Sequence, residues 1–322
     1  MNQKGATTLL TRRSAFWTAA GLLATAAAFP PTARSSAQDT PVSVEVSLAK
    51  NTVMEGEPIV LNYKITNFSD GEAWLEFGES RKTWLGLNLV DGVGRSAPAL
   101  TERRPLNVRY EGPFASEGIT LSPRMVSEGS VVVSRRLASP RPGRHALLVN
   151  LRLPYAVGPV NDPTLHERAH AGQNPLTKQM RLFLTVIRAD AAQVRSVADA
   201  LKEEITQNGG VLSNDGMMST DLAIQKLFSM PARYARPSQM ALVSDPRLSQ
   251  RAQQLLFTRL IGIGSTLIVD FLEDAAWTLN VEEARSALCV LHIYNDPALR
   301  KRIEKMFADH GQPMTRPVVE FG

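Results

Sequence analysis

From residue 42 onward, the first half of the chain alternates between hydrophobic and polar positions with a period of two. Residues 42–48 read Val-Ser-Val-Glu-Val-Ser-Leu, the pattern of a strand with one buried face. Similar short runs, each bounded by Gly, Pro, Asn or Asp, occur at residues 59–67, 73–77, 85–90, 131–134, 145–153 and 180–188. None of them has a helical period. We therefore predict a two-sheet antiparallel β-sandwich over residues 38–188.

Near residue 189 the hydrophobic period becomes helical. Val194, Val197, Leu201 and Ile205 follow a spacing of three and four, and Asn208-Gly209-Gly210 ends that run. After a loop at residues 211–219, further helices are expected at residues 220–230, 237–243, 246–261, 267–279, 281–294 and 297–310. No strand pattern intervenes, so residues 189–322 are predicted to form an α-helical domain.

The helical half contains one internal repeat. The segment 245–251 reads Asp-Pro-Arg-Leu-Ser-Gln-Arg, and the segment 296–302 reads Asp-Pro-Ala-Leu-Arg-Lys-Arg. An Asp suits the N-cap of a helix and a Pro suits its first position. Repeated helices of this period resemble HEAT-type repeats, and the resemblance implies stacked helices with a concave protein-binding surface. An irregular helical bundle is the alternative.

Three short motifs in the first half resemble those of bacterial immunoglobulin-like domains. They are Gly56-Glu57-Pro58-Ile59 before the second predicted strand, Asn67 at the end of that strand, and Pro142-Gly143 before a late strand. His145 stands where such domains usually have a Tyr, and an imidazole can replace the hydrogen bond of the phenol. The resemblance covers roughly residues 40–188. It implies binding, spacing or bracing, and no catalysis.

The first 37 residues are predicted to be a signal peptide. Arg12 and Arg13 precede an apolar run at residues 15–29, and Ser35-Ser36-Ala37 supplies small residues for cleavage. The run is too short to span a bilayer. Because it is only mildly hydrophobic and is followed by Arg34, the leader resembles a twin-arginine signal, with a general secretory signal as the alternative. We expect a periplasmic or secreted protein that does not span the membrane once the leader is removed.

Removing the leader changes the charge of the chain. The leader holds four of the 36 Lys and Arg residues and none of the 31 Asp and Glu residues, so the remainder has a net charge of +1. A chain this balanced has no general attraction for nucleic acid or for an anionic membrane. Cys289 is the only cysteine, which excludes an intrachain disulfide, and it lies in an apolar helical run. We expect a buried structural thiol.

Two kinds of side chain are candidates for ligand binding. Trp74 and Trp84 flank the third predicted strand. They either pack in the core or form an exposed aromatic platform, in which case the protein would be a glycan-binding accessory module. Arg135, Arg136 and Arg141 belong to a segment with four arginines and no acid. Guanidinium groups suit carboxylate or phosphate ligands, and a solvated loop is the alternative.

The segment His166-Glu167-Arg168-Ala169-His170 fits the zinc-hydrolase pattern H-E-x-x-H. In that chemistry two imidazoles one helical turn apart hold zinc and the Glu activates a water. Arg168 places a positive charge beside the metal, and the segment falls in a polar region between two predicted strands. We therefore interpret it as a surface loop, and a zinc-dependent hydrolase that uses His166, Glu167 and His170 is the alternative function.

The sequence contains no other catalytic pattern that we recognise. Phosphate-binding Gly-Lys-Ser or Gly-Lys-Thr loops, a G-x-S-x-G nucleophile and paired cysteines are missing. We therefore expect a non-catalytic exported binding or scaffolding protein of the cell envelope, without a cofactor. Its expected partner is a protein or a surface ligand, and not nucleic acid.

Overall fold

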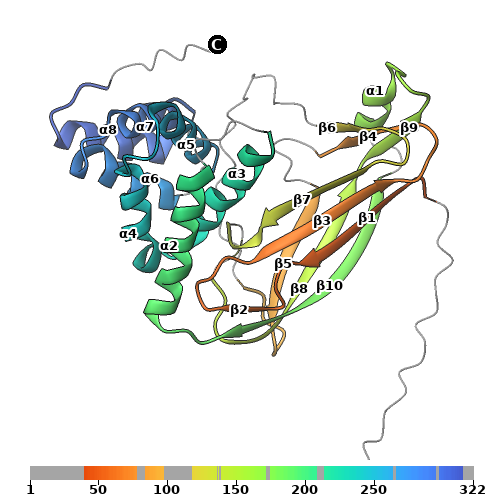
Figure 1. Cartoon of the computed structure of the whole chain (residues 1–322), viewed down its shortest axis with the longest axis horizontal. Helices are drawn as coiled ribbons and strands as arrows, with labels where there is room; N and C mark the ends of the chain where they lie inside the picture. The colour runs from red at the N-terminus through yellow and green to blue at the C-terminus, as the bar shows by residue number, and fades with distance from the viewer. Residues whose placement is uncertain are drawn as a thin grey trace, which may run out of the picture. The chain divides into compact units, whose positions relative to one another are not determined.

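The computed structural model describes residues 40–77, 84–97, 118–135, 137, 139–171, 175–208, 214–263, 266–294 and 297–314 (Figure 1). The predicted signal peptide, residues 1–37, lies outside this part. The described residues form a β-sheet region followed by a helical region, which confirms the predicted fold class. The expected two antiparallel sheets are wrong in detail, because the strands form three sheets and one pair is parallel.

Within the described part, ten strands form three hydrogen-bonded sheets with the orders β1-β3-β7, β2-β10-β8-β5 and β6-β4-β9. All neighbouring pairs are antiparallel except β2 and β10, which pair in parallel through residues 52–54 and 185–187. The strands are β1 (Val42–Leu48), β2 (Thr52–Met54), β3 (Val60–Asn67), β4 (Glu72–Glu76), β5 (Leu85–Asp91), β6 (Gly118–Leu121), β7 (Val126–Val132), β8 (Gly143–Leu153), β9 (Tyr155–Gly158) and β10 (Leu176–Ile187).

Most predicted strands are confirmed, with two kinds of difference. The run at 131–134 holds only the end of β7, because residues Val133–Arg135 turn into a 3-10 helix, η2. The strands β2, β6 and β9 have no counterpart among the predicted strands. They are three or four residues long, too short for a period of two to be visible, and each is defined by its hydrogen bonds to a neighbouring strand.

The alternation along the longer strands places one set of side chains in a shared core. Leu61 and Ile65 of β3, Leu89 of β5 and Leu147 of β8 are completely buried. Asn67 is also completely buried, and its Nδ2 donates to the backbone oxygens of Gly71, Leu121 and Ser122. Because a buried amide without partners is costly, these bonds explain why a polar residue can end β3 inside the protein.

The helices are α1 (Leu165–His170), α2 (Ala191–Asn208), α3 (Asn214–Ser229), α4 (Ala232–Val243), α5 (Gln250–Ile263), α6 (Thr266–Glu273), α7 (Glu282–Tyr294) and α8 (Pro297–Asp309). A π-helical turn, η3 (Asp274–Thr278), continues α6. The helices from α2 onward bury a second hydrophobic core that includes Phe271, and Phe228 packs edge-on against that ring. No helix within the described residues is both long and apolar enough to cross a bilayer.

Three predicted helix boundaries are wrong. α3 begins at Asn214, inside the expected loop, and α4 begins at Ala232 and contains Pro237. α5 begins at Gln250 rather than at residue 246. The reason is that Oδ1 of Asp245 accepts from the backbone N of Arg247, at 3.0 Å, and this bond closes a turn before the helix. In the second copy of the repeat the helix includes the proline, since α8 begins at Pro297.

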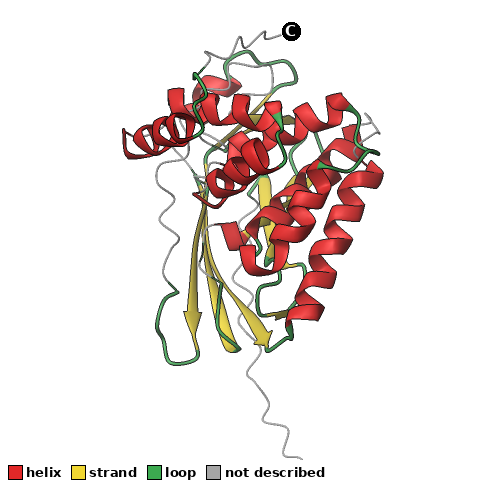
Figure 2. Cartoon of the chain, turned by 90° about the vertical axis from the view of Figure 1, so that its left-hand side faces the viewer, coloured by secondary structure: helices red, strands yellow, loops and turns green. Residues whose placement is uncertain are grey.

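The sheet region and the helical region touch at the turn between β2 and β3. Gly56 in this turn has φ +93°, and a Cβ added there would lie 3.2 Å from Cε2 of Tyr234 and 3.4 Å from Cγ1 of Val194. Nearby, α3 runs beside β7 (Figure 1), and Figure 2 shows helices lying against strands from a second direction. Residues 40–322 form one compact unit.

Candidate functional site

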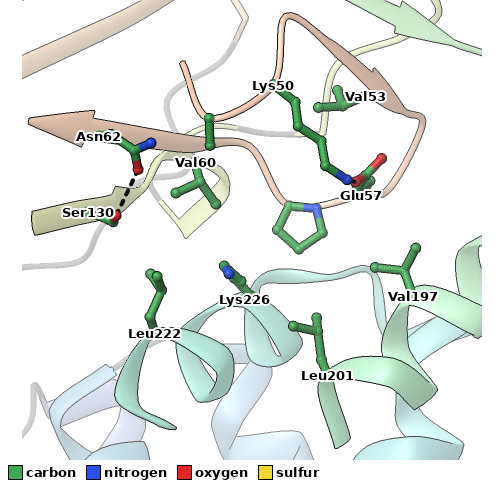
Figure 3. Close-up of a pocket in the computed structure, with 12 residues that line it drawn as sticks. Lys50, Val53, Glu57, Val60, Asn62, Ser130, Val197, Leu201, Leu222 and Lys226 are labelled. Atoms are coloured by element: carbon green, nitrogen blue, oxygen red, sulfur yellow. Dashed lines mark hydrogen bonds and ion pairs between the residues drawn. The ribbon is translucent and has the colours of Figure 1, made fainter. Parts of the chain in front are cut away.

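A pocket of about 210 Å³ lies where the first sheet meets α2 and α3 (Figure 3). Its sheet side is formed by the segment before β2, the β2–β3 turn, and the first residues of β3. Its helical side is formed by one face of α2 and one face of α3. The pocket therefore exists only because two regions with separate hydrophobic cores come together.

The walls of the pocket are largely apolar. Val53, Pro58 and Val60 contribute to the sheet side, and Val197, Leu201 and Leu222 contribute to the helical side (Figure 3). Val60 precedes the buried Leu61, so the alternation of β3 turns its side chain away from the core of the sheets. Val197 and Leu201 are four residues apart and share one face of α2. Apolar walls with a few polar groups are typical of small-ligand sites.

Glu57 fixes the shape of the pocket at the β2–β3 turn. Its carboxylate accepts a hydrogen bond from the backbone N of Met54 at 2.9 Å and lies 2.5 Å from Nζ of Lys50. The Glu57 side chain is only 8% exposed, whereas that of Lys50 is 65% exposed. The charge of Glu57 is thus neutralised by Lys50, and Glu57 and Pro58 form part of one wall of the pocket.

The second ammonium group of the pocket belongs to Lys226 of α3. Lys226 is half-buried and lines the pocket opposite the sheet side (Figure 3). Among the described residues, no carboxylate lies within ion-pair distance of its Nζ. The other polar lining groups are Asn62 and Ser130, whose hydroxyl donates to Oδ1 of Asn62 at 2.8 Å. Among the described lining residues, Lys50 and Glu57 form an ion pair, and Lys226 carries a positive charge without an acidic partner.

A second, more open hollow of about 610 Å³ lies over β1, β3 and β7 and shares Asn62 and Ser130 with the pocket. Its charged groups include Lys64 and Glu128, which face each other across neighbouring strands at 3.7 Å. Glu45 adds another carboxylate. These exposed charges have both signs, so the hollow has no single charge to attract a ligand.

The two candidate tryptophans have different environments. Trp84 is 2% exposed and packs edge-on against Tyr63 and Phe77. Trp84 therefore packs in the core, one of the two expected positions, and it forms no exposed platform because its ring lies against those two aromatic rings. Trp74, on β4, is half-buried and meets the ring of His166 edge-on at 5.1 Å. Its position leaves part of the indole accessible.

The arginine-rich segment is only partly described. Arg136 and the side chain of Arg135 lie outside the described residues, and Arg141 is exposed. The backbone oxygen of Arg141 accepts a hydrogen bond from Nε2 of His145 at 2.8 Å. The imidazole of His145 thus makes a hydrogen bond to the backbone four residues upstream.

The H-E-x-x-H segment forms the short helix α1 rather than the expected surface loop. The imidazoles of His166 and His170 are stacked with their centroids 6.0 Å apart, and both residues are exposed. Arg168 is held by Asp162 at 3.0 Å. Within the described ranges, no group of three His, Cys, Asp or Glu residues is arranged to hold a metal ion.

Three further side chains with reactive groups, Cys289, His292 and His310, lie in the helical region. Cys289 is buried, as predicted. Nε2 of His292 lies 3.0 Å from Oε1 of Glu304. His310 stacks on Trp277 with centroids 4.4 Å apart.

Sequence reasoning missed the pocket and Lys226, because no local pattern marks a lysine that faces a distant strand.

No family model matches the chain, and no curated protein matches it. Among solved structures, an ASH/PapD-like domain of human CEP192 is 12% identical, covers 54% of this chain and 99% of that chain, and gives a TM-score of 0.24. The periplasmic chaperone SfaE is 9% identical, with 46% and 58% covered and a TM-score of 0.23. Escherichia coli alpha-2-macroglobulin is 11% identical, with 84% and 28% covered and a TM-score of 0.22. The β region thus has distant PapD-like neighbours, and nothing about function follows from them.

Proposed function

We propose that this chain is a non-catalytic binding protein of the bacterial cell envelope, and that it holds its ligand in the pocket between the sheet region and α2 and α3. The observation that carries the proposal is the lining of that pocket. Apolar side chains from both regions line the same pocket as Lys226, whose ammonium group has no acidic partner among the described residues. Such a lining favours the capture of a ligand.

The proposal includes the export and the domain organisation expected from the sequence. Residues 1–37 act as a twin-arginine signal, so the protein works in the periplasm or outside the cell. Residues 38–188 and 189–322 act as an immunoglobulin-like domain and a HEAT-like domain. The two hydrophobic cores support this division, and the contact of Gly56 with Tyr234 supports a fixed joint between them.

The binding function is tested by native mass spectrometry of the exported chain, isolated from the envelope without denaturation. We expect the protein to carry a bound small molecule, and the variant Leu222→Trp to lose it because the indole fills the pocket. The matched control Ile293→Trp changes an exposed aliphatic residue of α7 outside the pocket and keeps the bound mass. The proposal is contradicted if no bound mass is detected and the Tm does not rise when the small-molecule fraction of the envelope is added.

A further inference from the structure

We infer that the pocket binds an amphipathic monocarboxylate, with its carboxylate at Nζ of Lys226 and its apolar body between the sheet side and the helical side of the pocket. The inference rests on the proposed function and names the chemical class of the ligand. It covers two sources of the same chemistry, a free medium-chain carboxylic acid and the C-terminal residue of a peptide.

The charge of the pocket supports an anionic ligand. Lys50 and Glu57 neutralise each other at 2.5 Å, and Glu57 is additionally held by the backbone N of Met54. Among the described residues that line the pocket, Lys226 remains as the single net charge. Lys226 is half-buried as a residue, its ammonium group has no acidic partner among the described residues, and an anion in the pocket would supply that partner.

The kind of cation supports a carboxylate over a phosphate. A phosphate group carries up to two negative charges and is best held by several donors or by the fork of an arginine. Lys226 supplies one positive point charge, and no arginine is among the described residues that line the pocket. A ligand with a single negative charge therefore matches the pocket.

The size of the pocket limits the apolar part of the ligand. An apolar cavity of about 150 Å³ is known to hold benzene. A pocket of about 210 Å³ accordingly suits an apolar body of roughly six to nine carbon atoms. Octanoate, with seven carbons beside its carboxylate, has this size, and the side chain of a C-terminal leucine, with four carbons, is smaller and fits within it.

The experiment uses the mature chain and isothermal titration calorimetry with four probes. These are octanoate, its uncharged analogue octanamide, N-acetyl-alanyl-leucine, and the C-terminal amide of that dipeptide. We expect the carboxylate form of at least one pair to bind tenfold or more tightly than its amide. The pair that binds better distinguishes a free acid from a peptide C-terminus.

Three variants locate the site. Lys226→Met keeps the length of the side chain and removes its charge. It should weaken binding of the carboxylate probes about tenfold or more and leave binding of the amide probes unchanged. Val197→Phe should weaken the binding of both kinds of probe by filling the pocket. Lys305→Met removes an exposed lysine of α8 and should change neither. Circular dichroism with a melting curve confirms that each variant folds.

The inference is overturned if neither carboxylate binds, if the amides bind equally well, or if Lys226→Met binds the carboxylates as the unchanged protein does. These results leave the proposed function standing where native mass spectrometry still detects a bound molecule that Leu222→Trp loses. If that molecule is also missing, both the ligand class and the binding function fail.

Discussion

Gly56 in the β2–β3 turn lies against the ring of Tyr234 in α4, so closely that a Cβ at this glycine would be 3.2 Å from Cε2 of the tyrosine. In the sequence, this glycine is the first residue of the Gly-Glu-Pro motif. Its structural role is to let a turn of the sheet region approach two helices, α2 and α4.

Replacing Gly56 by alanine should destabilise the protein in two ways. Its φ of +93° disfavours any Cβ, at a cost of about 1–2 kcal/mol, and the contact with Tyr234 adds about 1 kcal/mol of overpacking. Gly94 is the matched control, because it has φ +85° but a Cβ added there would meet no atom within 4 Å. Urea unfolding should show a larger loss for Gly56→Ala than for Gly94→Ala. Equal losses would mean that the contact with the helices contributes nothing.

Asp245 should make the stability of the helical region depend on pH below 4. Hydrogen bonds from the side chain and the backbone N of Arg247 lower the pKa of Asp245 to about 2, from an ordinary value of about 3.9. Because the folded pKa is depressed, the stabilisation is complete above about pH 3.9 and is lost as the pH falls towards 2. Between pH 5 and pH 2, the melting temperature should fall less steeply for Asp245→Asn than for the unchanged protein.

The control for this titration is Asp70→Asn, which removes a carboxylate paired with Arg124 on the exposed surface of the sheet region. It should keep the steep fall of Tm with pH. Glu203 belongs to the same network as Asp245, because it binds Arg247 at 2.8 Å, and the side-chain bond from Arg247 lowers the pKa of Glu203. If the melting temperature of Asp245→Asn falls with pH as steeply as that of the unchanged protein, the pH dependence belongs to other groups.

The proposed signal peptide at residues 1–37 predicts a route of export that can be tested. Changing Arg12 and Arg13 together to lysine should remove most of the protein from the periplasm if the twin-arginine route is used, because that route reads the arginine pair itself. Arg34→Lys, which leaves the pair intact, should be exported normally. The periplasmic fraction measured by immunoblotting decides the matter, and normal export of the double variant would favour the general secretory route.

The stacked pair His166 and His170 should hold no structural zinc. Two exposed imidazoles on a six-residue helix supply two ligands, whereas structural sites have four and catalytic sites have three from the protein. Elemental analysis of the purified protein should therefore find less than one zinc per chain, with the same value for His166→Ala. Stoichiometric zinc that His166→Ala loses, together with hydrolysis of a peptide or an ester, would replace the binding function by the hydrolase alternative.

Some features depend on which residues lie side by side in space. The burial of Trp84 follows from the rings of Tyr63 and Phe77 around it, and the flanking sequence is compatible with a buried or an exposed indole. The helical form of α1 is also hidden from the sequence pattern, because a six-residue helix is too short to show a hydrophobic period. Its buried residues, Leu165 and Ala169, pack towards β4 and β9.

The sequence by itself determined the order of a β region and an α region, since residues two apart share a strand face and residues three or four apart share a helix face. It also predicted the buried state of Cys289, and it fixes a near-zero net charge for residues 38–322. Only the tertiary structure decided that Lys226 of α3 meets the Gly56-Glu57-Pro58 turn across an apolar pocket. Periodicity describes the faces of one element, whereas a pocket depends on how two elements far apart in the chain pack together.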